Sequence, residues 1–225
     1  IYYQFRESVL ALAEACKLFE TPVTGGNVSF YNETSGAAIY PTPVIGMVGV
    51  LEDVDHITRH AFQNVGDTII LLGDNTDELG ASEYLYVVEG LVAGEPPKVD
   101  LLGERGLQHA VLAMIRNRLL HSAHDVSEGG LACALAESAL GPGESPFGVQ
   151  VTLHDAIPVL PLLFGEAQGR IVVSCDPQSA DEVLVLAKRH GVPCRAVGQV
   201  VSSDESFRID GRTATLEADV ETLAE

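Results

Sequence analysis

Strand-like and helix-like segments alternate along the second part of the chain, and this alternation restricts the possible folds more than any other feature. Short apolar runs of strand length are separated by longer segments in which apolar residues recur at helical spacing. The predicted strands are residues 68–72, 148–153, 170–175 and 194–200, and the predicted helices are residues 106–121, 127–140 and 179–190. This order is typical of an α/β protein in which helices flank a mixed sheet.

The first part of the chain has a different pattern. Its predicted elements are a helix with one apolar face at residues 4–19, a strand at 28–31, a strand at 43–51 and a linker or short helix at 53–64. The run at 43–51, PVIGMVGVL, has little polar alternation, so we expect a strand that is buried on both faces. Because a second unit begins near Asp67, we expect one domain at residues 1–64 and an α/β domain at residues 65–225.

The charge of the chain excludes some classes of function. Asp and Glu number 32 against 13 Lys and Arg, which gives a net charge of −19. Sequence-independent binding to nucleic acid needs a basic surface, so we expect no nucleic-acid partner. The lysines are Lys17, Lys98 and Lys188, and none follows a GxxxxG pattern, so there is no Walker A loop. Phosphates would have to bind to backbone N–H groups, to helix N-termini or to a metal ion.

The cysteines and the apolar runs indicate the cellular compartment in which the protein is expected. The chain has 4 cysteines, widely spaced and without a CxxC pair, so we expect reduced thiols rather than a zinc site or disulfides. No apolar run reaches the roughly 18 residues of a membrane span, and no signal peptide is visible. We therefore expect a cytoplasmic protein without a membrane partner. Since it starts at Ile1, we also expect it to be a piece of a longer chain.

The stretch TGGNVSFYNET, residues 24–34, is unusually polar for a segment between two apolar elements. One interpretation is a tight turn, in which the glycines allow positive φ angles. The other is a ligand site, because Asn27, Ser29, Tyr31 and Glu33 alternate and would face one side of a strand. Their oxygen atoms would suit a hydrated metal site, with the backbone accessible at the glycine pair.

A second motif, HSAHDVSEGG, covers residues 121–130 and precedes a predicted helix. Either Asp125 or Ser127 could cap that helix, or the SEGG turn could bind phosphate through free N–H groups. A catalytic pair of His124 and Asp125 is disfavoured, because adjacent residues of an extended segment point to opposite faces.

A third motif, FGEAQGR, covers residues 164–170 and precedes a predicted strand. If the segment is extended, Glu166, Gln168 and Arg170 line one side of a site. The alternative is a solvated turn.

Five motifs occur in the order and approximate spacing of one enzyme family. They are GGNVSFYNE, PTPVIGMVGVLEDV, LGASEYL, HDVSEGGLACALAES and LFGEAQGR. Together they resemble the C-terminal part of phosphoribosylformylglycinamidine synthase, and the resemblance covers nearly all of the chain. Other ATP-dependent enzymes of the aminoimidazole ribonucleotide synthetase-like superfamily share the architecture, but GGNVSFYNE favours the first family.

The resemblance implies an internally duplicated enzyme, each half of which has a sheet-rich domain followed by an α/β domain. This chain resembles the second half and begins inside its sheet-rich domain, so residues 1–64 would be a truncated domain. The first half, which carries the family's catalytic histidines, ATP lysine and most magnesium carboxylates, is not in this sequence. We therefore expect no catalytic residue here, and we expect the chain alone to be inactive.

The family's reaction uses ATP, Mg²⁺, formylglycinamide ribonucleotide, and ammonia that a glutaminase subunit or domain releases from glutamine. ATP phosphorylates the amide oxygen, and ammonia then displaces phosphate to give formylglycinamidine ribonucleotide. Carried over to this sequence, the resemblance implies that Gly26 contacts ATP, Asn27 binds Mg²⁺ and Ser29 contacts the substrate. The duplication also implies an auxiliary, non-catalytic nucleotide site, with Asp125 and Glu166 as metal ligands and Ser127, Gly129 and Gly130 facing the phosphates.

A different class of function remains open. The chain alone would then be a nucleotide-binding and assembly module that performs no catalysis. Nucleotide titration with and without magnesium separates such a module from an inert scaffold.

Overall fold

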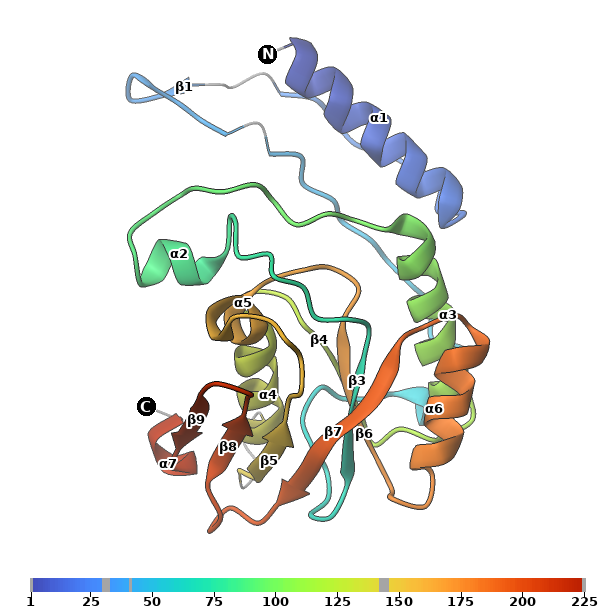
Figure 1. Ribbon diagram of the computed structural model, residues 1–225. Helices are drawn as coiled ribbons and strands as arrows, with labels where there is room; N and C mark the ends of the chain where they lie inside the picture. The colour runs from blue at the N-terminus through green and yellow to red at the C-terminus, as the bar shows by residue number, and fades with distance from the viewer. Residues whose placement is uncertain (1, 30–32, 41, 142–145, 224–225) are drawn as a thin grey trace. The chain divides into compact units, whose positions relative to one another are not determined.

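The computed structural model describes residues 2–29, 33–40, 42–141 and 146–223 (Figure 1). It divides the chain into two compact units, Ile1–Glu52 and Asp53–Glu225. The division lies earlier than the boundary expected after residue 64, because the segment after Glu52 packs on the second unit. The N–H of the buried Phe62 donates to the carbonyl of Ser138 at 2.8 Å, for example. The assignment of the two units to domains of a duplicated enzyme stays a prediction.

The first unit contains one long helix and one minimal hairpin. Its elements are the helix α1, Tyr2–Leu18, and the strands β1, Glu33–Thr34, and β2, Ala37–Ala38. The two strands pair antiparallel around the turn Ser35–Gly36. The predicted helix is confirmed, but its expected buried face is not, since α1 has no buried residue.

The predicted strand PVIGMVGVL is wrong. Over the described residues of this run, 43–51, the chain has no regular secondary structure, and its side chains are exposed, including Val48 at 95% and Val50 at 91%. A strand buried on both faces needs a sheet and two covering layers, and the described part of this unit supplies only the β1–β2 ladder. The strand expected at 28–31 is not formed at Val28 and Ser29, and its other residues lie outside the described part of the chain.

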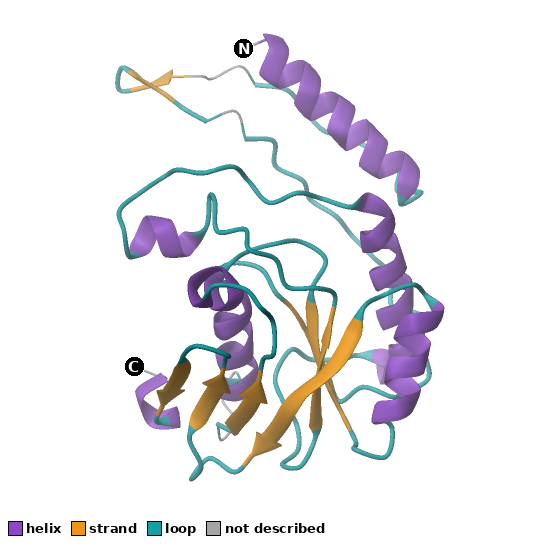
Figure 2. Ribbon diagram, viewed as in Figure 1, coloured by secondary structure: helices purple, strands orange, loops and turns teal. Residues whose placement is uncertain are grey.

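The second unit is a mixed sheet with helices on both sides (Figure 2). Its strands are β3 Thr68–Leu72, β4 Ser122–Asp125, β5 Gly148–Thr152, β6 Ile171–Cys175, β7 Cys194–Val201, β8 Phe207–Asp210 and β9 Thr215–Ala218. Its helices are η1 Val54–His56, α2 Glu83–Val87, α3 Leu101–Arg116, α4 Gly130–Leu140, α5 Val159–Phe164, α6 Ala180–Arg189 and α7 Val220–Leu223.

The 7-stranded sheet has the order β4-β6-β3-β7-β5-β8-β9. Neighbouring strands pair antiparallel, except that β5 pairs parallel with β8. The sheet is therefore mixed, and the predicted fold class, α/β with a mixed sheet flanked by helices, is confirmed.

The central strand β3 explains why its sequence, TIILL, has no polar alternation. Ile69 and Leu71 belong to the core that α4 and α5 cover, whereas Ile70 and Leu72 belong to the core under α3 and α6. In Figure 1 these two helix pairs lie on opposite sides of the sheet. A strand between two helical layers must be apolar on both faces, which is the pattern of a buried strand.

Two helices differ in their bounds from the predicted ones. The helix expected at 106–121 runs from Leu101 to Arg116. It starts earlier because the side chain of Asp100 caps it and accepts from the N–H of Leu102 at 3.1 Å. The helix expected at 127–140 begins only at Gly130. Among the described helices, none combines the length and the apolarity needed to cross a lipid bilayer.

Candidate functional site

One carboxylate joins three of the sequence motifs. Oε1 of Glu166, in FGEAQGR, accepts from the N–H of Gly129 at 2.8 Å and from the N–H of Glu83 at 2.8 Å. Gly129 belongs to HDVSEGG and precedes α4, and Glu83 belongs to LGASEYL and is the first residue of α2. The second and third motifs therefore meet in space, as the resemblance implied for an auxiliary site. No pattern in the sequence indicates that Glu83 would join them.

The backbone around Gly130 is too close to its neighbours for any larger residue. A Cβ atom at Gly130 would lie 2.7 Å from the backbone carbon of Phe164 and 2.8 Å from the carbonyl oxygen of Gly165. The φ angle of Gly130 is +73°, in the left-handed region that favours glycine. The second glycine of SEGG is thus required by the contact between the start of α4 and the end of α5.

Arg170 holds the shape of the FGEAQGR loop from inside. Its side chain is 3% exposed, and its guanidinium donates to the carbonyls of Gly165 at 2.6 Å and Ala167 at 3.2 Å and to Oδ1 of Asn75 at 3.0 Å. Burial, together with the nearby charge of Arg195, lowers the pKa of Arg170 to about 10. Both interpretations of this motif need correction, because the segment is neither a solvated turn nor an extended row. It folds around the guanidinium, and Gln168 is exposed while Arg170 is buried.

The predicted side-chain cap of α4 is wrong. The N-cap position is Gly129, and no side-chain hydrogen bond from its own segment caps the helix. Asp125 ends β4, where it pairs with Ile171 of β6, and Ser127 lies exposed in the turn that follows. The cap comes instead from Glu166, which is far away in sequence, so no local pattern could reveal it. Capping therefore does not account for Asp125 and Ser127.

His124 and Asp125 form no catalytic pair in the structure. Nε2 of His124 lies 3.4 Å from Oε2 of Glu137, and the ring of His60 lies 5.2 Å away between centroids. Burial lowers the pKa of His124 against the opposing effect of the neighbouring carboxylates. The imidazole therefore belongs to a half-buried contact beside α4, and Asp125 is exposed.

The residues predicted from the first motif lie in the other unit. Gly26, Asn27 and Ser29 are exposed and belong to no regular secondary structure. Tyr31, which the alternation placed with them, lies outside the described residues. Within the described part of the chain, no group of three His, Cys, Asp or Glu side chains is arranged to hold a metal ion. The metal-ligand roles of Asn27, Asp125 and Glu166 stay predictions.

A buried polar network, which the sequence did not predict, crosses one end of the sheet. Asp67 is 3% exposed, and both of its carboxylate oxygens lie 2.9 Å from Nδ1 of His121. The hydroxyl of Ser174 donates to Oδ2 of Asp67 at 3.4 Å and lies 2.8 Å from the hydroxyl of Ser122. The three strand-end segments that meet here are far apart in sequence, so only the fold brings them together.

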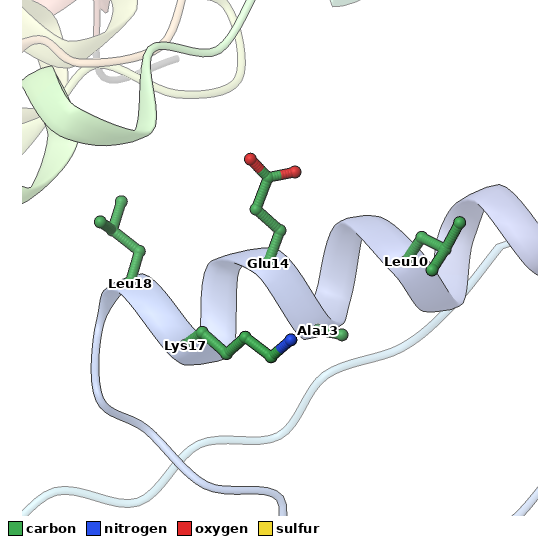
Figure 3. A pocket seen from close by; sticks show the side chains of 5 residues that line it. All are labelled: Leu10, Ala13, Glu14, Lys17 and Leu18. Carbon is green, nitrogen blue, oxygen red and sulfur yellow. The ribbon is translucent and has the colours of Figure 1, made fainter.

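A hollow along one side of α1 contains none of the predicted site residues. It is lined by Leu10, Ala13, Glu14, Lys17 and Leu18 (Figure 3). These side chains all come from one helix, so the hollow has no convergent polar groups from other elements and does not resemble a built ligand site.

The fold and its motif-bearing turns agree with one protein family. The family described as AIR synthase related protein, C-terminal domain, matches residues 64–211, and this chain belongs to that family. The match covers most of the second unit, including the segments that meet at Glu166.

The chain also resembles individual curated proteins. The chain is 46% identical over 219 residues to the phosphoribosylformylglycinamidine synthase subunit PurL of Chlorobium luteolum, covering 94% of this chain and 29% of the relative. It is 47% identical over 210 residues to the protein of the same name from Symbiobacterium thermophilum, covering 93% of this chain and 27% of the relative. The resemblance indicated by the motifs is therefore confirmed. The chain spans less than a third of the length of these relatives.

Solved structures show the same fold. Thermotoga maritima PurL complexed with FGAR aligns with a TM-score of 0.63 at 23% identity, covering 76% of this chain and 30% of that one. T. maritima PurL complexed with ATP aligns with a TM-score of 0.59 at 23% identity, covering 76% and 28%. The structure of PurLQS from T. maritima aligns with a TM-score of 0.56 at 23% identity, covering 76% and 28%. At this level of identity the likeness is one of fold.

Proposed function

We propose that this chain is the C-terminal part of an ATP-dependent carbon–nitrogen ligase, a phosphoribosylformylglycinamidine synthase of purine biosynthesis. The amide oxygen of formylglycinamide ribonucleotide attacks the γ-phosphorus of ATP and releases ADP. Ammonia then attacks the activated carbon and displaces phosphate. The observation that carries the proposal is that three motifs of this family converge on Glu166 in one site.

The first unit would contribute one edge of the ATP and substrate site. Gly26 would lie against ATP, Ser29 would hydrogen-bond to the substrate, and the side-chain oxygen of Asn27 would bind Mg²⁺. An amide oxygen is a hard ligand that suits this cation. All three residues are exposed, so they are accessible to ligands. When bound, Mg²⁺ would neutralise the phosphate charge that this acidic chain cannot balance with lysine.

The second unit would contribute the auxiliary nucleotide site. Oε1 of Glu166 already accepts two N–H groups, but within the described residues Oε2 accepts no hydrogen bond and is available to a cation. Asp125 and Ser127 are exposed beside the same turn. The N–H of Gly129 donates to Glu166 and that of Gly130 donates to the carbonyl of Ser127 at 3.1 Å. A phosphate that faces these two glycines would therefore have to displace both contacts.

The proposed partners follow from the reaction. A glutaminase subunit or domain would supply ammonia, and the preceding part of the polypeptide would supply the catalytic histidines. We also propose that the whole protein is cytoplasmic, as expected of a soluble biosynthetic enzyme with reduced cysteines.

A second candidate function, an assembly module without catalysis, is favoured by one observation. Among the described residues of the first unit, none is buried, and Val44 and Val50 are 90% and 91% exposed. Such a unit needs further protein to cover its apolar side chains.

A thermal melt of this chain with ADP tests the site in the second unit. The expected result is a rise in the midpoint with ADP and Mg²⁺ together, smaller with ADP alone, and lost in Asp125→Ala. Asp181→Ala, which changes an exposed aspartate of α6, is the matched control and should keep the rise. Absence of any shift at millimolar ADP, in a chain that melts cooperatively, would remove the auxiliary site from the proposal.

A further inference from the structure

Residues 81–93 form a loop whose two ends meet. The N–H of Ala81 donates to the carbonyl of Ala93 at 2.8 Å. Beside this hydrogen bond, a Cβ atom on Gly80 would lie 2.1 Å from the carbonyl oxygen of Glu95, so the two backbones are in direct contact. A loop of this length with closed ends is an Ω-loop, a type of segment that is often functional.

The loop is ordered internally but has little buried surface. Ser82 caps α2 by accepting from the N–H of Leu85 at 3.4 Å, and the N–H of Leu91 donates to the carbonyl of Leu85 at 2.9 Å. The helix α2 has no buried residue, and the exposed apolar side chains of the loop are Tyr86, Val87, Val88, Leu91 and Val92. Segments with few buried apolar contacts open at low free-energy cost.

Beyond its base, the loop is joined to the rest of the unit at one end of α2. Beside the base, the buried hydroxyl of Ser82 donates to the carbonyl of Leu79 at 2.7 Å. Farther from the base, two contacts among the hydrogen bonds and ring contacts of the described residues join the loop to the unit. The N–H of Glu83 donates to Oε1 of Glu166 at 2.8 Å, and the ring of Tyr84 stacks on that of Phe164 at 5.1 Å between centroids. In Figure 1 the loop leaves the layers of the sheet and carries α2 beside the end of α5.

The contact with Glu166 links the loop to a second place in the fold. The same oxygen that accepts from Glu83 also accepts from Gly129, at the start of α4. Arg170 fixes the FGEAQGR segment, which carries this carboxylate. Its guanidinium donates to the backbone carbonyls of the two residues that flank Glu166, Gly165 and Ala167. The backbone that carries the carboxylate is therefore held in place, whereas α2 reaches the rest of the unit through Glu83 and Tyr84.

We propose that residues 81–93 are a hinged loop and that Glu166 is the latch that holds it closed. Opening of the loop and release of the Gly129 N–H are coupled through this one carboxylate. The hinge is the base at Ala81 and Ala93. Any cation or partner that draws the carboxylate of Glu166 away releases both N–H groups together. A charged acceptor makes a stronger hydrogen bond than a neutral one, so loss of its charge weakens both contacts.

Amide hydrogen exchange of this chain with short labelling times tests the coupling. In Glu166→Ala, the amides of residues 83–92 and of Gly129 should exchange at least fivefold faster, while those of β3 and β6 keep their protection. Glu128→Ala removes a neighbouring exposed carboxylate that makes no such contact with the described residues, and it should leave both regions unchanged.

Glu166→Gln provides the second measurement, since its amide oxygen still accepts but carries no charge. In this variant the exchange rates should rise less than in Glu166→Ala, and only in residues 83–92 and at Gly129. The result stays interpretable even if the alanine variant also loosens β3 and β6. Unchanged protection of residues 83–92 in a folded Glu166→Ala chain would overturn the latch. Faster exchange of the loop without any change at Gly129 would overturn the coupling. If the alanine variant is loosened throughout, the Glu166→Gln variant decides. Wild-type exchange of residues 83–92 and of Gly129 in that variant would then overturn the proposal.

Discussion

The backbones of Gly130 and Phe164 touch, because a Cβ atom at Gly130 would lie 2.7 Å from the backbone carbon of Phe164. This contact sets the start of α4 against the end of α5, and it brings Glu166 within reach of Gly129. The candidate site of the second unit therefore depends on a residue without a side chain as much as on its carboxylate.

Replacing Gly130 with alanine should destabilise the second unit strongly. Gly191 is the matched control, because its φ angle is also +73° but a Cβ atom added there would meet no atom within 4 Å. Gly191→Ala should lower the free energy of unfolding by about 1 kcal/mol, the cost of a left-handed conformation alone. Gly130→Ala should cost roughly 2 kcal/mol more, since backbone must move to admit the methyl group.

Urea unfolding of the two variants measures this difference. Equal losses of stability would show that the turn relaxes freely and that the contact between α4 and α5 is not tight. Both substitutions share the cost of a left-handed conformation, so this cost cancels in the comparison. The remaining difference in the free energy of unfolding measures how tightly α4 and α5 are packed at Gly130.

The stability of the protein should fall at alkaline pH because of Cys175. Burial raises the pKa of this thiol from 9.0 to about 11, and the carboxylates of Asp67 and Asp176 act in the same direction. The unfolded chain therefore loses the proton first as the pH rises. The stabilising contribution is complete below about pH 9 and is lost as the pH rises through about 11, by roughly 2–3 kcal/mol in total.

Unfolding of the reduced protein between about pH 8 and about pH 11 tests this prediction. Cys175→Ala is less stable at every pH because of the cavity that it creates, but its stability should fall less steeply across the window. The other thiols with raised pKa values, Cys133 and Cys194, remain in both proteins. Identical slopes would mean that Cys175 ionises as easily in the folded state as in the unfolded one.

Much of the second unit could be predicted from sequence, because periodicity reports burial directly. The apolar run of β3 and the spacing of α6 each indicated the correct element. The candidate site was only partly predictable, since a motif specifies which residues are special and not which of them meet. The contact of Glu166 with Glu83 and the pairing of Asp67 with His121 join segments far apart in sequence. Such contacts arise from topology and have no local signal.

The failure of the strand at 43–51 has a physical cause. PVIGMVGVL has the composition of a buried strand. Composition indicates the environment that a segment requires, but other parts of the protein must supply that environment. The described residues of the first unit offer only the two-stranded β1–β2 sheet, without helical layers to cover a further strand, and Val48 is 95% exposed. The same residues are therefore the part of the chain most expected to change on association with more protein.

In the full-length synthase that we propose, Asn27→Ala should impair magnesium-dependent use of ATP more than it impairs folding. Asn27 is exposed, so its loss should cost little stability. A lost metal ligand should lower kcat/KM for ATP on the order of tenfold or more, with partial recovery at raised Mg²⁺. Asn117→Ala, which removes an exposed amide at the end of α3, is the control and should keep wild-type kinetics. Wild-type kcat/KM in Asn27→Ala would make the motif structural.

Complementation tests the proposed function most directly. Turnover of formylglycinamide ribonucleotide with ATP and ammonia is measured for this chain, for the preceding part of the polypeptide, and for the two parts together. We expect that neither part alone forms the amidine and that the two parts together do, in a reaction that requires ATP and Mg²⁺. Turnover by this chain alone at the rate of the combined parts, or full activity of the preceding part without it, would contradict the proposed function.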